Sequence, residues 1–474
     1  MADERLCRLS ATRMLRRFRQ GELSPVEVAS AQLERIERLD PERTVFRLVD
    51  PDRTLAQARQ AEVRYQELDR GGHLDGVPVA VKDSFYTRGW STLYGSHMVD
   101  PDQPWEQDAP SVSALRRQNA VLLGKTTMPE FGWKAVNDSP LTGTTRNPWD
   151  RSRTPGGSSG GNGVALATGM CSLALGSDIG GSVRIPASFC NVVGLKPTQH
   201  IAPVRRDAKT GLLLHAGVMA RTVEDIALAM DVIAEWHPNR PARPSGAPTY
   251  RSALDQDVEG LRVALTPGLG FARVDPEVRE AVAGVGRTLD SLDAWINEVD
   301  PGIEDPTDLY SRLLVPTLAL SVDQVPPERR DRIDPGLAEI AEWGRTMLAV
   351  EHAAAMQERR ALIGKVGRLQ QHYDILVTAT VPVLPFTADR EVPPGWPHRR
   401  WWTWTPLTFP FNITGQPAIS VPCGFSAGGL PIGVQFVGPR HREDLVLKVA
   451  HAYQRANPLF HLRPGETPGG SGAG

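Results

Sequence analysis

Two glycine-rich stretches, each holding a serine, constrain this chain more than any other feature of its sequence. Residues 154–163 read TPGGSSGGNG, and a second unit, Gly180-Gly181-Ser182, places its serine 24 positions after Ser158. Glycine lacks a Cβ, adopts backbone conformations that other residues resist, and weakens helices and strands when it occurs in runs. The chain therefore carries serine hydroxyls on tight turns, which the rest of the fold must hold in place.

The first stretch does not fit two common uses of glycine-rich loops. A phosphate-binding loop ends in Lys followed by Ser or Thr, and a dinucleotide fingerprint needs a third glycine where Val-Ala-Leu stands here. Residues 156–160 formally match the G-x-S-x-G nucleophile elbow. That elbow follows a hydrophobic strand, whereas residues 147–155 are polar and turn-forming. Phosphate binding and a hydrolase elbow are therefore both disfavoured.

The second stretch has the composition of an oxyanion hole. Glycines just before Ser182 let successive backbone N–H groups turn toward one point, where they can stabilise a developing negative charge. We therefore predict Ser182 as a nucleophile. The predicted donors are the backbone N–H groups of Ile179, Gly180, Gly181 and Ser182. A plain tight turn is the better interpretation of one such stretch alone, but the recurrence of the pattern favours a catalytic role.

A serine nucleophile needs a base, and Lys82 is the candidate. It ends the apolar run Val77-Pro-Val-Ala-Val, so its amine is expected at the edge of the core. Burial disfavours the ammonium form and lowers the pKa of a lysine, and a neutral amine can accept a proton. On position alone, a surface lysine that follows a strand is equally consistent. No lysine has a serine three positions before it, which excludes the S-x-x-K arrangement.

Composition limits the class of protein. The 474 residues carry a net charge of −2, with 41% hydrophobic and 23% charged residues, which is typical of a globular protein without a nucleic-acid partner. Four distant cysteines indicate reduced, buried thiols, with neither disulfides nor a zinc ribbon. The charged N-terminus shows no secretory signal, so we expect a cytoplasmic location. The longest run of small apolar residues, 163–176, is too short to span a bilayer and predicts a buried helix.

The pattern along the chain alternates between helices and strands, which predicts an α/β fold. Ser24-Pro25-Val26-Glu27 forms a capping box with proline at the first helical position. Helices are expected over 25–39, 55–68 and 222–236, and mainly helical structure over 275–369 with interruptions near Pro316 and Pro326. Strands are expected over 76–83, 120–124, 260–266, 373–378, 417–422 and 432–437, the last two as neighbours.

Several of these segments together resemble the amidase signature family. They are GGSSGGNG, GSDIGGSVRIPAS, VVGLKPT and the earlier VAVKD, with weaker similarity in MARTVEDIA and Asn412-Ile-Thr-Gly-Gln-Pro417. The resemblance implies a single large α/β/α domain around a mixed, central β-sheet of about ten strands flanked by helices. We place this domain at residues 1–465, with a signature core at about 76–236, a Pro-rich linker at 237–250, a variable substrate-side region at about 260–410 and a disordered tail at 466–474.

The resemblance also implies roles for individual residues. Ser182 falls at the nucleophile position, Ser158 at the bridging position after a cis peptide bond from Gly157, and Lys82 at the base position. Ser158 would relay the proton of Ser182 to Lys82 and then back to the leaving amine. Ser159 would support the loop, and Asp178 and Arg184 would brace the two turns. No metal or cofactor is expected. The sequence departs from the family pattern at Ser84, at Asn191 and after Thr198, where it reads QHIAPVRR.

Aromatic residues give the one hint of substrate. Four of the 11 tryptophans lie within nine residues, on a Pro-rich segment at 396–404. Such a loop either covers a pocket or packs on neighbouring helices, and the sequence does not separate the two. The predicted pocket residues are Phe131, Trp133, Trp402 and Trp404. The expected function is hydrolysis of a small-molecule amide with an aromatic or bulky apolar group.

Other functions stay open at this point. A glutamine amidotransferase subunit that works with partner subunits occurs in the same family, and biosynthetic acyl transfer to an amine would use the same chemistry. A scaffold with a dead site is disfavoured because all three triad positions are filled. We expect neither nucleic acid nor membrane as a partner, and a homodimer is compatible with the sequence.

Overall fold

The computed structural model describes residues 4–67, 71–202, 204, 211–234 and 249–465. The predicted tail and most of the predicted linker lie outside this range. The helices are α1 (Glu4–Cys7), α2 (Ala11–Arg19), α3 (Pro25–Leu39), α4 (Pro51–Gln66), α5 (Pro110–Arg117), α6 (Gly160–Ala167), α7 (Arg184–Cys190), α8 (Val223–Ile233), α9 (Pro276–Asp290), α10 (Thr307–Asp323), α11 (Pro335–Thr346), α12 (Ala349–His372), α13 (Pro410–Thr414) and α14 (Glu443–Ala456).

The strands form one mixed sheet and a separate short hairpin. They are β1 (Phe46–Val49), β2 (Pro78–Lys82), β3 (Val121–Thr126), β4 (Asp138–Ser139), β5 (Gly143–Thr144), β6 (Leu173–Asp178), β7 (Val193–Lys196), β8 (His215–Ala220), β9 (Arg262–Leu265), β10 (Trp295–Glu298), β11 (Ile375–Ala379), β12 (Ala418–Phe425) and β13 (Pro431–Val437). The 11-stranded sheet has the order β1-β3-β2-β6-β8-β7-β12-β13-β11-β9-β10, and β4 pairs with β5. This central sheet confirms the predicted fold class.

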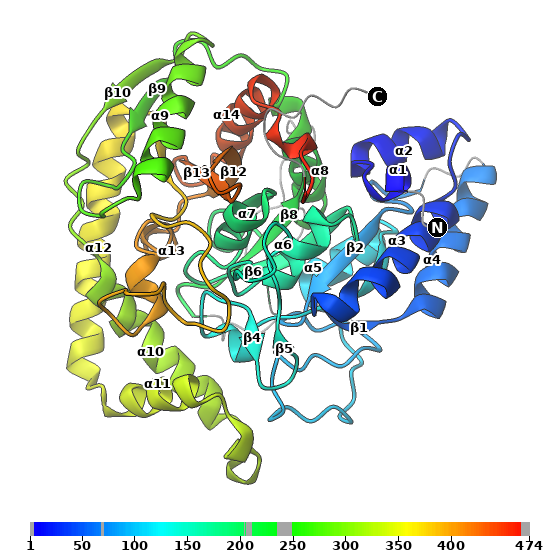
Figure 1. The fold of residues 1–474 in the computed structure, drawn as a ribbon, viewed down its shortest axis with the longest axis horizontal. Coiled ribbons are helices and arrows are strands. Elements are labelled where there is room, and N and C mark those ends of the chain that lie inside the picture. Colours follow the sequence, from blue (N-terminus) through cyan, green and yellow to red (C-terminus); the bar gives the residue numbers. More distant parts are fainter. Residues whose placement is uncertain (1–3, 68–70, 203, 205–210, 235–248, 466–474) are drawn as a thin grey trace.

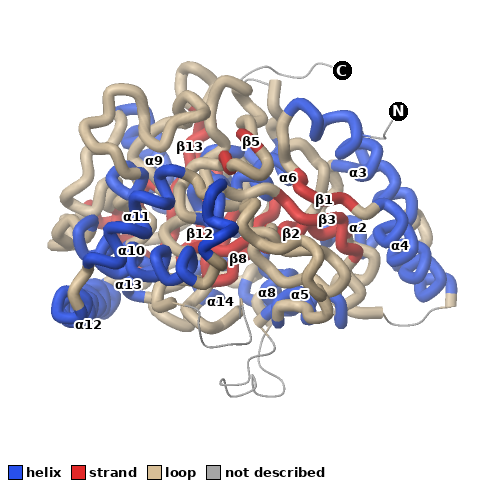
Figure 2. Tube along the Cα trace, turned by 90° about the horizontal axis from the view of Figure 1, so that it is seen from below, coloured by secondary structure: helices blue, strands red, loops and turns tan. Residues whose placement is uncertain are grey.

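Strand β2 shows why the sheet is buried on both faces. Val79 and Val81 pack in one hydrophobic cluster with Ile226 of α8, while Ala80 packs in another cluster with Val164 of α6. Side chains alternate between the two faces of a strand, so these clusters lie on opposite sides of the sheet. Figure 2 shows the strands running through the middle of the molecule, with α5, α8 and α14 along one side. The apolar run before Lys82 therefore reflects a strand covered on both faces.

A second hydrophobic cluster lies beside the sheet and is built on α10, α11 and α12. It contains Tyr310, Leu314 and Ile340, together with all three tryptophans of residues 401–404. In Figure 1 these helices lie at the opposite side of the molecule from the N-terminal helices α1–α4. The aromatic segment thus helps to hold the α10–α12 unit against the rest of the domain.

The structure confirms several predicted elements and corrects others. The capping box of Ser24 and Glu27 is present at the start of α3, and β12 and β13 pair as antiparallel neighbours. The predicted helix over 163–176 is wrong, because α6 ends at Ala167 and β6 begins at Leu173. Strand β10 interrupts the region predicted as mainly helical. Pro316 lies inside α10 without ending it.

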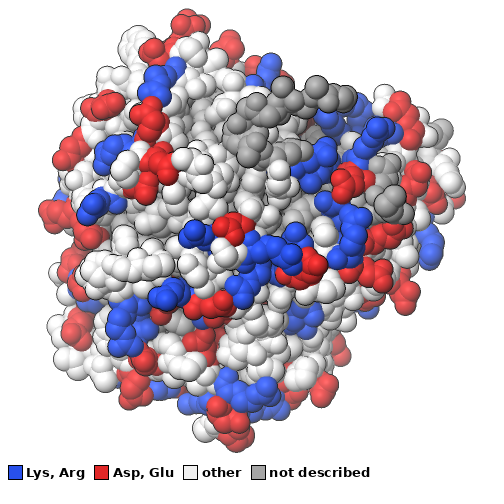
Figure 3. Space-filling view, viewed as in Figure 1, with Lys and Arg blue, Asp and Glu red and all other residues white. Residues whose placement is uncertain are grey.

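The four cysteines are free and buried, as predicted. No helix within the described ranges is long and apolar enough to cross a membrane. Acidic and basic side chains are interspersed over the face drawn in Figure 3. This mixed surface agrees with the near-zero net charge of the sequence.

Candidate active site

The candidate site lies where two parallel neighbouring strands end. Lys82 is the last residue of β2, and Ser177 and Asp178 are the last two of β6. Because β2 and β6 pair in parallel, their carboxyl ends lie at the same edge of the sheet, where α/β proteins commonly bind ligands. Ser182 lies in the loop that leads from β6 into α7, and Ser158 lies just before α6, on the segment that follows the β4–β5 hairpin. Neighbouring strands thus bring together residues that are about 100 positions apart in the sequence.

The amine of Lys82 is enclosed by hydroxyl and carbonyl oxygens. Its Nζ lies 2.6 Å from Ser158 Oγ, 3.1 Å from Ser177 Oγ and 3.3 Å from the carbonyl oxygen of Ser177. Lys82 is completely buried, and this burial lowers its pKa to about 7, although the negative charge of Asp178 opposes the shift. A substantial fraction of neutral amine is therefore available near neutral pH.

The two serine loops are joined to each other. The Gly157–Ser158 peptide bond is cis. The backbone N–H of Ser159 donates to the carbonyl oxygen of Ser182 at 3.0 Å, and the hydroxyl of Ser159 donates to the carbonyl oxygen of Ser177 at 3.3 Å. In the described part of the chain, no hydrogen bond joins the hydroxyls of Ser158 and Ser182 directly. Residue 159 thus holds the loop of Ser158 against both the Ser182 turn and the end of β6.

The turn before Ser182 presents backbone donors, but one predicted donor is already used. The N–H of Gly181 donates to Asp178 Oδ1 at 2.8 Å, so it is not free to bind an oxyanion. The N–H groups of Ile179, Gly180 and Ser182 meet no acceptor among the described residues. Gly181 has φ of 123°, a conformation that glycine adopts without strain. The predicted hole is therefore reduced from four donors to three.

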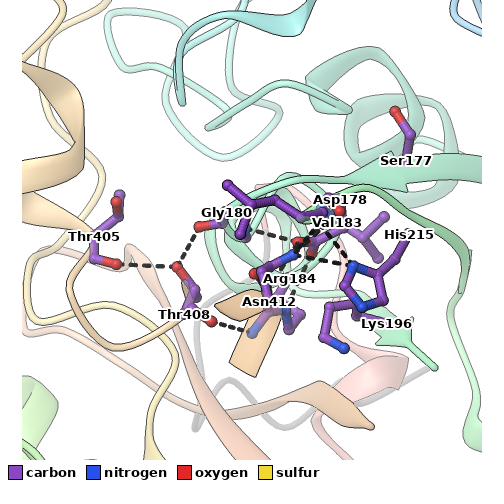
Figure 4. A network of polar contacts seen from close by, with 12 residues as sticks. Ser177, Asp178, Gly180, Val183, Arg184, Lys196, His215, Thr405, Thr408 and Asn412 are labelled. Atoms are coloured by element: carbon purple, nitrogen blue, oxygen red, sulfur yellow. Dashed lines mark hydrogen bonds and ion pairs between the residues drawn. The ribbon is translucent and has the colours of Figure 1, made fainter. Parts of the chain in front are cut away.

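A buried ion pair fixes this turn. Arg184 donates from Nη2 to Asp178 Oδ1 at 2.9 Å and from Nε to Asp178 Oδ2 at 3.1 Å. Figure 4 shows Asn412 beside the pair, and its amide nitrogen donates to Asp178 Oδ1 at 2.8 Å. Burial alone would raise the pKa of Asp178, but Arg184 and Asn412 outweigh it and hold that pKa well below its usual range. Asp178 is therefore ionised and held by Arg184 at the turn before Ser182, and its supporting role in catalysis stays a prediction.

Residues more than 200 positions later in the sequence complete the hydrogen-bond network around Arg184 and Gly180. The remaining guanidinium nitrogen of Arg184, Nη1, donates to Gln435 Oε1 at 2.6 Å and to the carbonyl oxygen of Thr408 at 2.8 Å. The hydroxyl of Thr408 donates to the carbonyl oxygen of Gly180 at 2.6 Å, as Figure 4 shows. Thr408, Gln435 and Ser177 are not among the residues predicted from the sequence. For Asn412, its one signal was the resemblance noted at residues 412–417.

A cavity of about 290 Å³ opens beside Ser158 and Ser177, the two serines whose hydroxyls contact Lys82. Ser84, Ser158 and Ser177 lie in its wall, together with Ile179 of the predicted oxyanion turn. The rest of the wall is mainly apolar and comes from the loops after β2 and β3, the residues before β8, and α10. No described residue that lines the cavity carries a charged side chain. Neutral, apolar groups are therefore the chemistry that this cavity accepts.

One of the predicted pocket residues lines this cavity. Phe131 does so and stacks on Tyr94, with ring centroids 5.8 Å apart and an interplanar angle of 12°. Trp133, Trp402 and Trp404 are instead buried in the second hydrophobic cluster and do not line the cavity. Trp404 stacks on Phe189 with centroids 6.0 Å apart. The tryptophan segment thus packs against neighbouring residues, which is the alternative that the sequence left open.

Comparison with known proteins identifies the family. The amidase family profile matches residues 27–447. The chain is a member of the amidase signature family. An acylamidase from Rhodococcus erythropolis is 33% identical over 478 residues, covering 98% of this chain and 99% of that protein. A glutamyl-tRNA(Gln) amidotransferase subunit from Synechococcus sp. (strain CC9605) is 34% identical over 500 residues, also covering 98% and 99%.

A solved structure agrees with this assignment. A bacterial aryl acylamidase of the amidase signature family matches with a TM-score of 0.88 and 28% identity, covering 95% of this chain and 97% of that one. This member of the family is accordingly a hydrolase that acts on amide C–N bonds. Acylamidase and amidotransferase relatives are about equally similar to it, so identity alone does not select between their substrates.

Proposed function

We propose that this protein hydrolyses neutral amides that carry an aromatic or bulky apolar group, through an acyl-enzyme on Ser182. The observation that carries the proposal is the contact of Lys82 Nζ with Ser158 Oγ at 2.6 Å, buried at the end of an uncharged cavity. A neutral amine next to one hydroxyl, with a second serine on an adjoining donor-rich turn, has the parts of a nucleophile and its base. No protein carboxylate or histidine is needed in this arrangement.

The proposed reaction runs through two acyl transfers. Ser182 Oγ attacks the amide carbonyl carbon while its proton passes to Ser158, which gives its own proton to Lys82. The N–H groups of Ile179, Gly180 and Ser182 bind the negatively charged oxygen of the tetrahedral intermediate. The C–N bond then breaks, and the leaving amine takes up the proton that Lys82 holds. Water hydrolyses the Ser182 ester by the same steps and restores the enzyme.

The proposed substrate class follows from the cavity wall. The stacked rings of Tyr94 and Phe131 form one side, and Leu314 of α10 also contributes. Offset stacking on an aromatic ring stabilises a bound aryl group beyond the burial of its surface. A charged substrate would lose its hydration in this cavity without a compensating partner among the described residues, which costs several kcal/mol. Aryl and bulky alkyl amides are therefore the proposed substrates.

A second candidate function is that of an amidotransferase component which releases ammonia from glutamine. The relatives that are glutamyl-tRNA(Gln) amidotransferase subunits favour it. Free glutamine carries an ammonium and a carboxylate group, and the described cavity wall offers no ion-pair partner for either. We therefore rank this function second. Acyl transfer to an amine in place of water is a variation of the first proposal, and added hydroxylamine would reveal it as a hydroxamate product.

Two measurements test the proposal. A fluorophosphonate probe should label the protein on one serine, and Ser182→Ala should abolish both labelling and amidase activity. Ser113→Ala, a partly exposed serine on α5, is the matched control that should keep both. In a panel of amides with matched leaving groups, kcat/KM should be highest for aryl acyl groups and far lower for glutamine. Undiminished activity in Ser182→Ala would rule out the proposed nucleophile, and a preference for glutamine would favour the amidotransferase.

A further inference from the structure

The base Lys82 has two hydroxyl neighbours, and the proposed reaction uses one of them. Ser158 Oγ lies 2.6 Å from Nζ and Ser177 Oγ lies 3.1 Å from it. The carbonyl oxygen of Ser177, at 3.3 Å, can act only as an acceptor and therefore takes one N–H. The neutral amine then has one N–H and one lone pair left for the two hydroxyls. The neutral Lys82 amine can thus accept a hydrogen bond from the hydroxyl of Ser158 and donate one to the hydroxyl of Ser177.

The second hydroxyl leads on to the substrate cavity. Ser177 Oγ lies 3.2 Å from Ser84 Oγ. Both serines line the cavity, and Ser84 follows Lys82 by two residues, just after the end of β2. A serine hydroxyl can donate one proton while it accepts another. The contacts therefore form an unbroken chain from the Lys82 amine through Ser177 to the Ser84 hydroxyl at the cavity wall.

We propose that Ser177 and Ser84 form a proton path out of Lys82, so that the proton enters the base from Ser158 and leaves it toward the leaving amine. This inference rests on the proposed function and deepens it. It replaces the return of the proton through Ser158, which the family resemblance implied. In this scheme Ser158 passes the proton of the nucleophile to Lys82, and Ser84 passes a proton that comes from Lys82 through Ser177 to the departing amine.

The transfer balances without any further reactant. When the C–N bond of the tetrahedral intermediate breaks, its electron pair stays on nitrogen, which takes the proton of the Ser84 hydroxyl. Ser84 takes the proton of Ser177, and Ser177 takes one from the ammonium group of Lys82. Lys82 is left neutral and both hydroxyls are regenerated. The net change is the movement of one proton from Lys82 to the leaving amine.

The leaving group gives the sharpest test. An amide nitrogen must be protonated to leave, whereas 4-nitrophenolate leaves without a proton. Ser84→Ala should therefore lower kcat/KM at least about tenfold for an alkyl amide, the size of a lost proton-transfer contribution. The 4-nitrophenyl ester of the same acid should change less than about twofold. Ser84→Thr, which keeps the hydroxyl, should restore amide hydrolysis. An equal loss on amide and ester, or no loss on the amide, would overturn the proposal.

A matched control separates this effect from the general loss of a buried hydroxyl. Ser172 lies just before β6, at the end of the strand opposite to Ser177, and is fully buried with a hydrogen bond of 3.0 Å from Gln32. Ser172→Ala should leave the ratio of amide to ester activity unchanged. A change in that ratio in Ser172→Ala as large as in Ser84→Ala would count against a specific path.

A second readout does not depend on catalysis. The sequence has seven lysines, so the Nζ signal of Lys82 can be followed by ¹⁵N NMR titration. Ser177→Ala removes an acceptor that the ammonium form needs more than the neutral form, and it should lower the pKa of Lys82 by about one unit. Ser177→Thr should restore it. An unchanged pKa would overturn the path even in an active enzyme, whereas an active Ser182→Ala variant would instead overturn the proposed nucleophile.

Discussion

The hydroxyl of Thr408 donates a hydrogen bond of 2.6 Å to the carbonyl oxygen of Gly180, on the turn that leads to Ser182. Thr408 is buried and lies 228 positions after Gly180 in the sequence. Because a peptide unit is planar, fixing the Gly180 carbonyl also fixes the direction of the N–H that follows it. Thr408 therefore holds the peptide plane that links Gly180 to Gly181, next to the proposed oxyanion donors.

Replacement of Thr408 should reduce turnover without weakening substrate binding. Thr408→Val keeps the shape and removes the donor, so we expect kcat to fall about tenfold or more, toward the loss seen when one oxyanion donor is removed. Thr408→Ser keeps the hydroxyl and should retain most of the activity. Steady-state kinetics on one aryl amide would measure this, and equal kcat in both variants would show that the hydrogen bond does not matter for turnover.

The pH dependence should report Lys82. Burial lowers its pKa to about 7, and the neutral amine is the proposed base. The value of kcat/KM should therefore fall as pH drops below about 7 and level off above it, because protonation removes the base. Lys82→Ala should lose at least about 10²-fold in kcat/KM. A profile that is flat between pH 5 and about 8 would contradict the assignment.

Lys125 is the internal comparison for that experiment. It is also buried with its pKa lowered to about 7, mainly by burial, but its amine donates to Thr92 Oγ1 at 2.8 Å and not to Ser158. Lys125→Met should therefore keep the acid limb of the activity profile near pH 7. If the acid limb disappeared in Lys125→Met but stayed in the unmodified protein, the limb would report the titration of Lys125 and not that of Lys82.

Phe131 should control substrate choice. Its ring lines the cavity and stacks on Tyr94, so Phe131→Ala removes one face of the proposed aryl site. We expect KM to rise by about fivefold or more for aryl amides, in line with the energy of an aromatic pair, and to change little for short aliphatic amides. A parallel set of KM values for both substrate classes would check this. Equal increases in the two classes would contradict an aryl site at Phe131.

Trp404 should affect stability and not substrate choice. It is completely buried, stacks on Phe189 and lies outside the cavity wall. Trp404→Ala should lower the free energy of unfolding by about 3–5 kcal/mol, as is usual when a large buried aromatic side chain is removed. Urea denaturation would measure the loss. In the folded fraction, the ratio of KM values for aryl and aliphatic amides should stay unchanged. A rise in KM for aryl amides alone would instead place Trp404 in the substrate site.

The helices and strands that were predicted correctly are those determined by residues close together in the sequence. The capping box at Ser24 and the apolar run before Lys82 depend on neighbouring residues, and both led to the right element. The helix predicted over 163–176 was wrong because small apolar residues suit a buried helix and a buried strand equally. Gly169, with φ of 74°, lies in the connection between α6 and β6, and composition alone did not reveal that break.

The candidate site could be predicted in part for the same reason. Ser158, Ser182 and Lys82 stand in short motifs that are visible in the sequence. Thr408 and Gln435 form hydrogen bonds with Gly180 and Arg184, which flank Ser182 but lie more than 200 positions earlier in the sequence. No local sequence pattern predicts these contacts. The tryptophan segment is conspicuous in the sequence, but its composition does not reveal whether the rings line a cavity or pack in a hydrophobic core.

The cavity wall is assembled from two distant parts of the chain. The proposed proton-transfer groups all lie between Lys82 and Ser182, whereas Leu314, Thr317 and Ser321 of the wall belong to α10. Substitutions at the α10 residues of the wall are therefore expected to change which amide the proposed site prefers, without altering the proposed acid–base groups. Under the proposed function, substrate range and chemistry would depend on separate parts of the chain, and α10 is the helix to randomise when activity on a new amide is wanted.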